Sequence, residues 1–163
     1  LSFYRLTYQH QHYFPITKDI VLMLNADLGY AKGLQGQSLP FYKNFYAGGV
    51  SSVRGYDTAS LGPVNPLYPD TRLGGTRKVV FNSELLLPLP GFDKSFRFGP
   101  FFDAGNVFTD QYTLSSDGLR MSYGIAAAWI SPLGPLKFSL GQPINEKSND
   151  KLQKFQFQLG TTF

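Results

Sequence analysis

The last twelve residues of the chain, LQKFQFQLGTTF at 152–163, alternate between apolar and polar side chains from Phe155 onward. One face of this segment carries Phe155, Phe157, Leu159, Thr161 and Phe163, and the other carries Gln156, Gln158, Gly160 and Thr162. Successive side chains of a β-strand point to opposite faces of its sheet, so a period of two predicts a strand with one apolar and one polar face.

Six earlier segments show a similar alternation and are bounded by turn-forming residues: 2–13, 20–30, 76–87, 95–108, 119–130 and 136–142. The polar faces of two of them carry Asn25 with Asp27, and Asn82 with Glu84. Hardly any segment has the 3.6-residue apolar period of a helix. The sequence therefore predicts an all-β fold of about seven antiparallel strands.

The composition favours strands that cross a membrane. Charged residues make up 16% of the chain, against roughly 25% in typical soluble domains, and aromatic residues also make up 16%. There is no run of about 18 apolar residues and the mean hydropathy is -0.16, so we expect no membrane-spanning helix. Strands between lipid and a polar interior contribute only half of their residues to the apolar surface, which gives this combination. A soluble β-sandwich is the alternative.

The connections alternate in length. Short ones at 14–19, 88–94 and 131–135 alternate with longer ones at 31–75, 109–118 and 144–151. Outer-membrane barrels have short periplasmic turns and long external loops, so the pattern predicts a periplasmic C-terminus and an external start of the first strand. Seven strands are an odd number and fewer than the eight of small barrels, so we expect part of a larger wall.

Other features exclude several classes of protein. The absence of cysteine excludes a disulfide framework and cysteine-based metal sites. The net charge is +4, but the basic residues are scattered, so we predict no nucleic-acid partner. Leu1 is not an initiator methionine and no signal-peptide pattern follows it, so we expect a mature piece or a fragment of a longer protein.

The long connection, 31–75, contains FYAGGVSSVRGYDTASLGP at 45–63, in which Arg54 is the single basic residue. An arginine on a loop folded into a barrel needs hydrogen-bonding partners because it loses hydration there. The inward carboxylates of Glu84 and Asp103 could supply bidentate contacts. The alternative is that Arg54 is an ordinary loop charge and the two carboxylates are independent.

The sequence indicates no enzyme and no cofactor. His10 and His12 share one face of the first strand, but two ligands without a third rarely hold a metal, and such residues are more often solvated. Ser51 and Ser52 lack the Gly-x-Ser-x-Gly pattern of a nucleophile, and no phosphate-binding loop is present. We therefore predict no catalytic residues and no metal site.

Five motifs, in order along the chain, resemble the BamA family of outer-membrane β-barrel assembly proteins of Gram-negative bacteria. They are PFYKNFYAGGVSSVRGY at 40–56, SLGP at 60–63, FFDAGNVF at 101–108, SPLGPLKFSLGQP at 131–143 and KFQFQLGTTF at 154–163. The VRGY motif alone is also found in the translocation subunits of two-partner secretion and in TamA-type assembly factors. The FYAGG lead-in and the terminal aromatic residue favour the BamA family.

The resemblance implies that 1–163 is a single partial barrel domain of the bacterial surface antigen type, with the loop 31–75 inserted. It corresponds to the last seven strands of a sixteen-stranded transmembrane barrel that follows periplasmic domains. The family's VRGY arginine implies that Arg54 contacts Glu84 and Asp103, while Gly55 lets the backbone approach closely. Val53 and Tyr56 would pack the tip of the loop.

The resemblance also implies a function. Such a protein folds and inserts other β-barrel proteins into the outer membrane without nucleotide hydrolysis. Its partners would be unfolded outer-membrane proteins, accessory assembly lipoproteins and outer-membrane lipid. A protein-secretion pore of the same superfamily and, less favoured, a passive porin are the alternatives.

The terminal strand has two compatible interpretations. Its aromatic residues up to Phe163 could simply face lipid, or they could form the terminal signal by which outer-membrane proteins are recognised for insertion. In the BamA family this strand pairs weakly with the first strand of the barrel and forms a seam that opens laterally. The seam would here comprise Phe155, Phe157, Leu159, Gly160 and Phe163. Gly160 fits a weak or kinked strand, and is equally compatible with a tolerated inward glycine.

Overall fold

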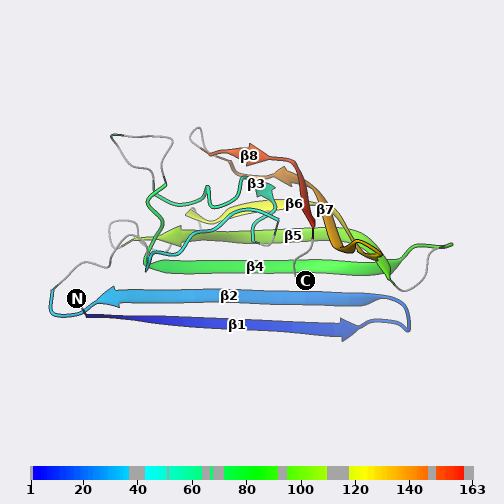
Figure 1. The fold of residues 1–163 in the computed structure, drawn as a ribbon, viewed down its shortest axis with the longest axis horizontal. Helices are drawn as coiled ribbons and strands as arrows, with labels where there is room; N and C mark the ends of the chain where they lie inside the picture. Colours follow the sequence, from blue (N-terminus) through cyan, green and yellow to red (C-terminus); the bar gives the residue numbers. More distant parts are fainter. Residues whose placement is uncertain are drawn as a thin grey trace.

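A single curved antiparallel sheet makes up most of the structure, a computed structural model that describes residues 2–36, 43–50, 52–63, 67, 72–91, 95–109, 118–146 and 150–159. Seven strands pair in the order β1-β2-β4-β5-β6-β7-β9 (Figure 1). Their bounds are β1 Phe3–Pro15, β2 Val21–Gly33, β4 Arg77–Pro88, β5 Phe96–Phe108, β6 Arg120–Ser131, β7 Gly134–Pro143 and β9 Phe155–Leu159. The predicted antiparallel β-fold is therefore confirmed. None of the helical turns in the described ranges is long and apolar enough to cross a bilayer.

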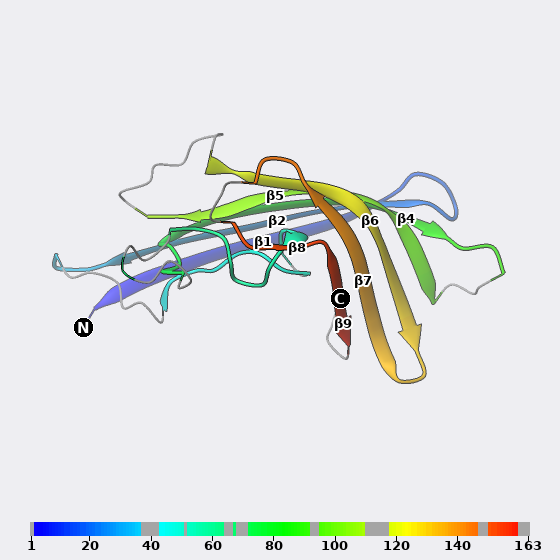
Figure 2. The same cartoon turned by 90° about the horizontal axis from the view of Figure 1, so that it is seen from above.

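The sheet is not closed. Within the described residues, β1 and β9 are its two edge strands, and β7 and β9 are steeply inclined to β1 and β2 (Figure 2). Strong twist and inclination of this kind are what a sheet needs in order to bend into a barrel wall. The described part of the chain between β2 and β4 lies over the concave face of the sheet (Figures 1 and 2).

The two faces differ in chemistry as the alternation predicts. Large apolar side chains on the outer face are exposed, among them Leu24, Phe81, Phe102, Tyr123 and Ile125. Polar side chains on the concave face instead pair across strands: Asn25 donates to Asn82 at 2.9 Å, and Lys78 pairs with Asp27 at 2.8 Å. An apolar exterior around a polar interior is the arrangement of a transmembrane barrel.

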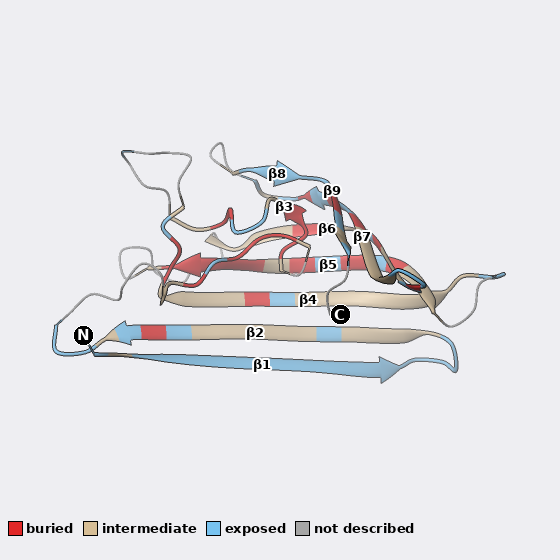
Figure 3. Cartoon of the chain, in the orientation of Figure 1, coloured by how far each residue is buried: buried red, intermediate tan, exposed pale blue. Residues whose placement is uncertain are grey.

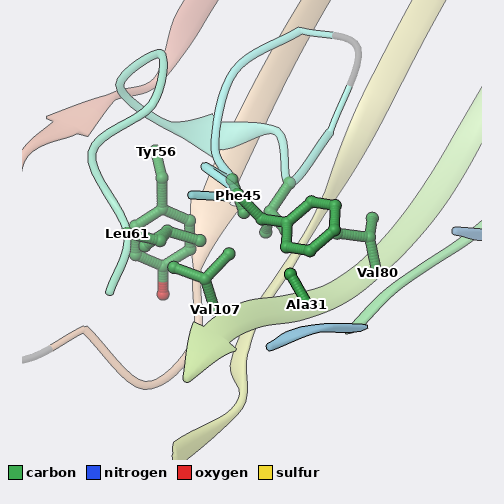
Figure 4. Packing of buried hydrophobic residues seen from close by; sticks show 8 residues of the cluster. Ala31, Phe45, Tyr56, Leu61, Val80 and Val107 are labelled. Carbon is green, nitrogen blue, oxygen red and sulfur yellow. The ribbon is translucent and has the colours of Figure 1, made fainter. Parts of the chain in front are cut away.

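The core of the chain lies between the loop and the sheet, and not within the sheet itself. Buried residues concentrate on β5 and on the loop, whereas nearly all of β1 is exposed (Figure 3). The core cluster consists of Ala31, Phe45, Ala47, Val53, Tyr56, Leu61, Val80 and Val107 (Figure 4). Full burial of one such large side chain contributes about 1.5–3 kcal/mol, so this cluster holds the loop firmly against the sheet.

The terminal strand corrects one prediction. We expected one continuous strand over 152–163, but the structure divides it into β8, Leu152–Gln153, and β9. The short β8 leaves the wall and pairs with β3, Gly55–Tyr56, in the loop, while β9 pairs with β7. Pairing with β8 satisfies backbone N–H and C=O groups of β3 that the buried loop would otherwise leave without a hydrogen-bond partner. Gly160 and Phe163 lie outside the described residues.

The other strand ends lie within three residues of the predictions, and the end of β5 at Phe108 matches its prediction. β2 runs on to Gly33 because Ala31 packs under the loop and its N–H donates to the carbonyl of Thr76 at 2.8 Å. β7 starts already at Gly134, which directly follows a turn closed by the hydroxyl of Ser131 bonding to the Gly134 carbonyl at 2.6 Å. A tertiary contact such as the first, or a local turn bond such as the second, is not visible in an alternation pattern.

Candidate functional site

Arg54 projects from the loop onto the inner face of β4 and β5 and reaches both predicted carboxylates. Its Nε and NH2 donate to the two oxygens of Asp103 at 2.7 and 2.8 Å, and its backbone N–H donates to Asp103 Oδ2 at 3.0 Å. NH1 donates to Glu84 Oε2 at 3.1 Å. The two-pronged contact with Asp103 fixes the plane and direction of the guanidinium.

The two carboxylates differ in their surroundings. The Asp103 side chain is 0% exposed, and that of Glu84 is 12% exposed. Glu84 borders a polar cavity of about 540 Å³ that is also lined by Gln11, Asn25, Asn82 and Lys137. Because a charge with access to water depends less on a protein partner, Asp103 is the principal partner of Arg54.

An aromatic ring completes the environment of Arg54. The guanidinium carbon lies 3.8 Å from the centre of the Phe101 ring, a cation–π contact. No role was predicted for Phe101, which lies on the same inward face of β5 as Asp103. The signal was available, since the two residues stand two positions apart on one strand in the FFDAG motif.

The residues flanking Arg54 fit the loop to the wall. Val53 and Tyr56 are each 0% exposed, and the Tyr56 hydroxyl donates to the Met121 carbonyl at 3.3 Å. Gly55 has a φ of 92°, a region that favours glycine. A Cβ on Gly141 of β7 would lie 2.9 Å from the Gly55 nitrogen, so the loop and the wall touch backbone to backbone.

A second polar contact holds the loop at Ser52, two residues before Arg54. Asn82 of β4 donates from Nδ2 to the Ser52 carbonyl at 2.7 Å while it accepts from Asn25. The Ser52 hydroxyl accepts from the Gly48 N–H at 3.2 Å and is engaged within the loop. Ser51, the other serine considered in the sequence, lies outside the described residues.

The terminal strand also reaches the loop. Phe155, Phe157 and Leu159 point outward and are about half exposed, at 55%, 51% and 51%. Between them Gln156 is only 3% exposed and contacts the backbone of the loop. The sequence placed Gln156 inward without giving it a role, and the alternation gives no signal that would have distinguished it from Gln158.

The histidine pair is not close to this site. His10 and His12 stack on the exposed face of β1, with ring centres 6.1 Å apart, in a series that continues to Tyr8 and Phe14. Throughout the described ranges no group of three or more histidine, aspartate, glutamate or cysteine side chains is arranged to hold a metal.

Comparison with known proteins gives the family. The Omp85 superfamily domain matches residues 1–163. The chain belongs to the Omp85 superfamily. Together with the apolar outer face of the sheet, this membership places the chain in the wall of an integral outer-membrane β-barrel, as predicted.

Two proteins in this superfamily are similar to the chain over most of its length. The outer membrane protein assembly factor BamA of Neisseria meningitidis is 38% identical over 192 aligned positions, which include 100% of this chain and 24% of that protein. The sorting assembly machinery 50 kDa subunit of Saccharomyces cerevisiae is 32% identical, covering 83% of this chain and 30% of that protein.

A solved Omp85 structure shows the same arrangement of strands. The crystal structure of BamA from Haemophilus ducreyi lacking POTRA domains 1–3 superimposes with a TM-score of 0.84 at 29% identity, covering 95% of this chain and 34% of that chain. The chain thus spans about a quarter to a third of the length of the relatives that it matches.

Proposed function

We propose that this chain forms part of the barrel wall, with its internal loop, of an assembly factor that folds and inserts β-barrel proteins into the outer membrane. Residues 1–163 would act as one partial barrel domain in which 31–75 is the inserted loop. The observation that carries the proposal is the buried contact between Arg54 and the two wall carboxylates, found in a chain related to named assembly factors.

The role proposed for the Arg54 contact is mechanical. A loop fixed on the inner face links β4 and β5 to the terminal strands and supports the wall from inside. An insertion machine must let its wall deform and then recover its shape. We propose that Arg54, Glu84 and Asp103 give the loop the fixed point around which this happens.

The proposed activity needs no catalytic centre. Folding of the substrate barrel in the membrane is itself favourable, so the assembly factor has only to lower the barrier, and no nucleotide or metal is required. The outward residues Phe155, Phe157 and Leu159, with Gly160 and Phe163 beyond them, would form the labile seam beside which a substrate strand pairs.

The proposed partners follow from this activity. Unfolded outer-membrane proteins would be the substrates, and the outer-membrane lipid contacts the exposed apolar face. Accessory assembly lipoproteins would be further partners. The relatives named above are assembly factors, which favours this function over a secretion pore or a passive porin.

Reconstitution tests the proposal. The full-length protein that contains this chain is placed in liposomes, and the membrane folding of an unfolded outer-membrane protein is followed by its gel mobility. We expect faster folding than in empty liposomes, and a clear loss of this acceleration with Arg54→Ala. The matched control is Arg97→Ala, because the NH1 of Arg97 donates to an exposed carbonyl, that of Asp19, at 3.3 Å.

Two results would contradict the proposal. Steady ion conductance without any acceleration would indicate a porin. Export of one dedicated partner, again without acceleration, would indicate a secretion pore.

A further inference from the structure

Gln156 of β9 makes two hydrogen bonds to consecutive residues of the loop. Its Oε1 accepts from the Gly55 N–H at 3.2 Å, and its Nε2 donates to the Tyr56 carbonyl at 2.7 Å. The side chain is buried, and both bonds join residues about a hundred positions apart in the sequence, with separations of 101 and 100. The amide side chain thus satisfies one donor and one acceptor of the loop backbone at the same time.

This contact continues a longer line of attachment between the loop and the terminal segment. Immediately before it in the chain, β8 pairs with β3, matching Gly55 with Gln153 and Tyr56 with Leu152. The Asp57 N–H then donates to the Lys151 carbonyl at 2.9 Å. The terminal segment is therefore bonded to the loop at residues 151–153 and 156. Lys154 and β9 are bonded to the wall, where the Gly141 N–H donates to the Lys154 carbonyl at 2.8 Å.

The attachment adjoins the Arg54 site directly. Gln156 accepts a hydrogen bond from the Gly55 N–H, which belongs to the peptide group that follows Arg54. The backbone N–H of Arg54 itself donates to Asp103. Two neighbouring backbone groups are therefore held by two different strands of the wall, one by β5 and the other by β9. A shift of the loop at one position is passed to the other, because only the φ and ψ of Arg54 separate the two planar peptide groups.

We propose that Gln156 is a positioning residue that couples the terminal strand to the loop. The contact of Arg54 with its two carboxylates and the contact of the terminal segment with the loop then form and break together, in one equilibrium. Loss of the Arg54 contact then frees the terminal segment, and loss of the Gln156 contact loosens Arg54. The consequence for insertion, that the loop controls how readily the terminal strand opens, rests on the proposed function. The coupling itself does not.

Disulfide trapping measures the coupling without any substrate. This chain contains no cysteine, so Asp57→Cys with Lys151→Cys introduces a single pair within it, at the two hydrogen-bonded positions directly beyond the β3–β8 ladder. The rate of disulfide formation in the full-length protein under mild oxidation reports how much of the time the terminal segment lies against the loop. Gln156→Met keeps the length of the side chain and removes both hydrogen bonds.

We expect Gln156→Met to slow cross-linking by about tenfold, which corresponds to the loss of two buried hydrogen bonds. Gln156→Glu keeps an acceptor for the Gly55 N–H but places a carboxylate against the Tyr56 carbonyl. This variant should also slow cross-linking. The matched control is Gln142→Met on β7, since the exposed Gln142 bonds only to the adjacent Pro143 carbonyl at 3.2 Å. Its rate should equal that of the parent.

The coupling is tested by adding Arg54→Met. This substitution alone should slow the same cross-link, because release of Arg54 also releases the terminal segment. Unchanged cross-linking in both Gln156 variants would overturn the positioning role. Unchanged cross-linking in Arg54→Met would overturn the coupling, because it would show that the terminal segment stays on the loop after Arg54 is released.

A separate insertion assay distinguishes this inference from the proposed function. Slower cross-linking with unchanged substrate insertion would leave the coupling intact and refute its role in insertion. Each variant is first checked for the heat-dependent gel shift of a folded barrel. If Gln156→Met fails to fold, Gln156→Glu, which has the same shape as the native side chain, decides the question.

Discussion

Replacing Asp103 by asparagine should release the loop far more readily than replacing Glu84 by glutamine. Asp103 is fully buried and accepts three hydrogen bonds, all from Arg54, whereas Glu84 accepts one and borders a polar cavity. Breaking a buried ion pair from one side costs about 3–5 kcal/mol, because the remaining charge stays desolvated. Glu84 is partly hydrated, so its loss should cost about 1 kcal/mol.

Trypsin can measure both costs at a single peptide bond. The bond between Arg54 and Gly55 is buried, so cleavage there requires the loop to leave its seat. When opening and closing are fast, the cleavage rate follows the population of the open state. Since every 1.4 kcal/mol is a factor of ten, a cost of about 3 kcal/mol raises the rate about a hundredfold and a cost of about 1 kcal/mol about fivefold.

The internal reference is cleavage after Lys18, in the exposed turn between β1 and β2, which neither substitution should change. Peptides are quantified by mass spectrometry on protein that keeps the gel shift of a folded barrel. Equal rates for Asp103→Asn and Glu84→Gln would refute the assignment of Asp103 as the principal partner. Unchanged rates in both would refute the idea that the ion pairs hold the loop at all.

Three further outcomes are expected from the same loop, and the Arg54–Gly55 cleavage assay reads the last two. Burial raises the pKa of Tyr56 from its ordinary value of about 10 to about 12, so the folded protein favours the neutral hydroxyl. The stability that this hydroxyl contributes is therefore complete below about pH 10 and is lost as the pH rises through about 12. Tyr56→Phe should remove that dependence, measured by the heat-dependent gel shift after incubation at each pH, and an alkaline loss of the folded band that persists in the variant would contradict it. Gly141→Ala should loosen the loop, because its Cβ would lie 2.9 Å from the Gly55 nitrogen; a rate equal to that of the parent would mean that the backbone contact is not close. Val53→Ala removes two methyl groups from a fully buried side chain and should cost about 1–3 kcal/mol, measured as a roughly tenfold faster cleavage.

The strands and their faces were predictable because alternation reports directly which side chains meet lipid and which meet the interior. Glu84 and Asp103 could be placed opposite Arg54 for the same reason: their positions in the alternation point them inward, and a confined arginine needs acceptors. The resemblance of the VRGY motif then selected this arrangement from the two that the residues alone left open. The outward position of Phe155 and Phe157 followed in the same way.

The division of the terminal strand could not be predicted from local sequence. Nothing in the alternation of 152–163 indicates that Leu152 and Gln153 bond to a loop about a hundred residues earlier, since hydrogen bonding between backbones leaves no residue pattern. Gln156 was missed for a related reason. Gln156 and Gln158 are the same residue type on the same face, and only the three-dimensional path of the loop distinguishes them.

The long reach of the Gln156 bonds has a consequence for the order in which the chain acquires its structure. Contacts between residues 100 and 101 positions apart close a very large loop of chain, so they form late in folding. The Arg54 loop leaves β2 early in the sequence, yet the backbone contacts of Gly55 and Tyr56 are complete only when β8 and β9 have formed. A polypeptide truncated before β8 should therefore accumulate with Gly55 and Tyr56 undocked and open to proteases.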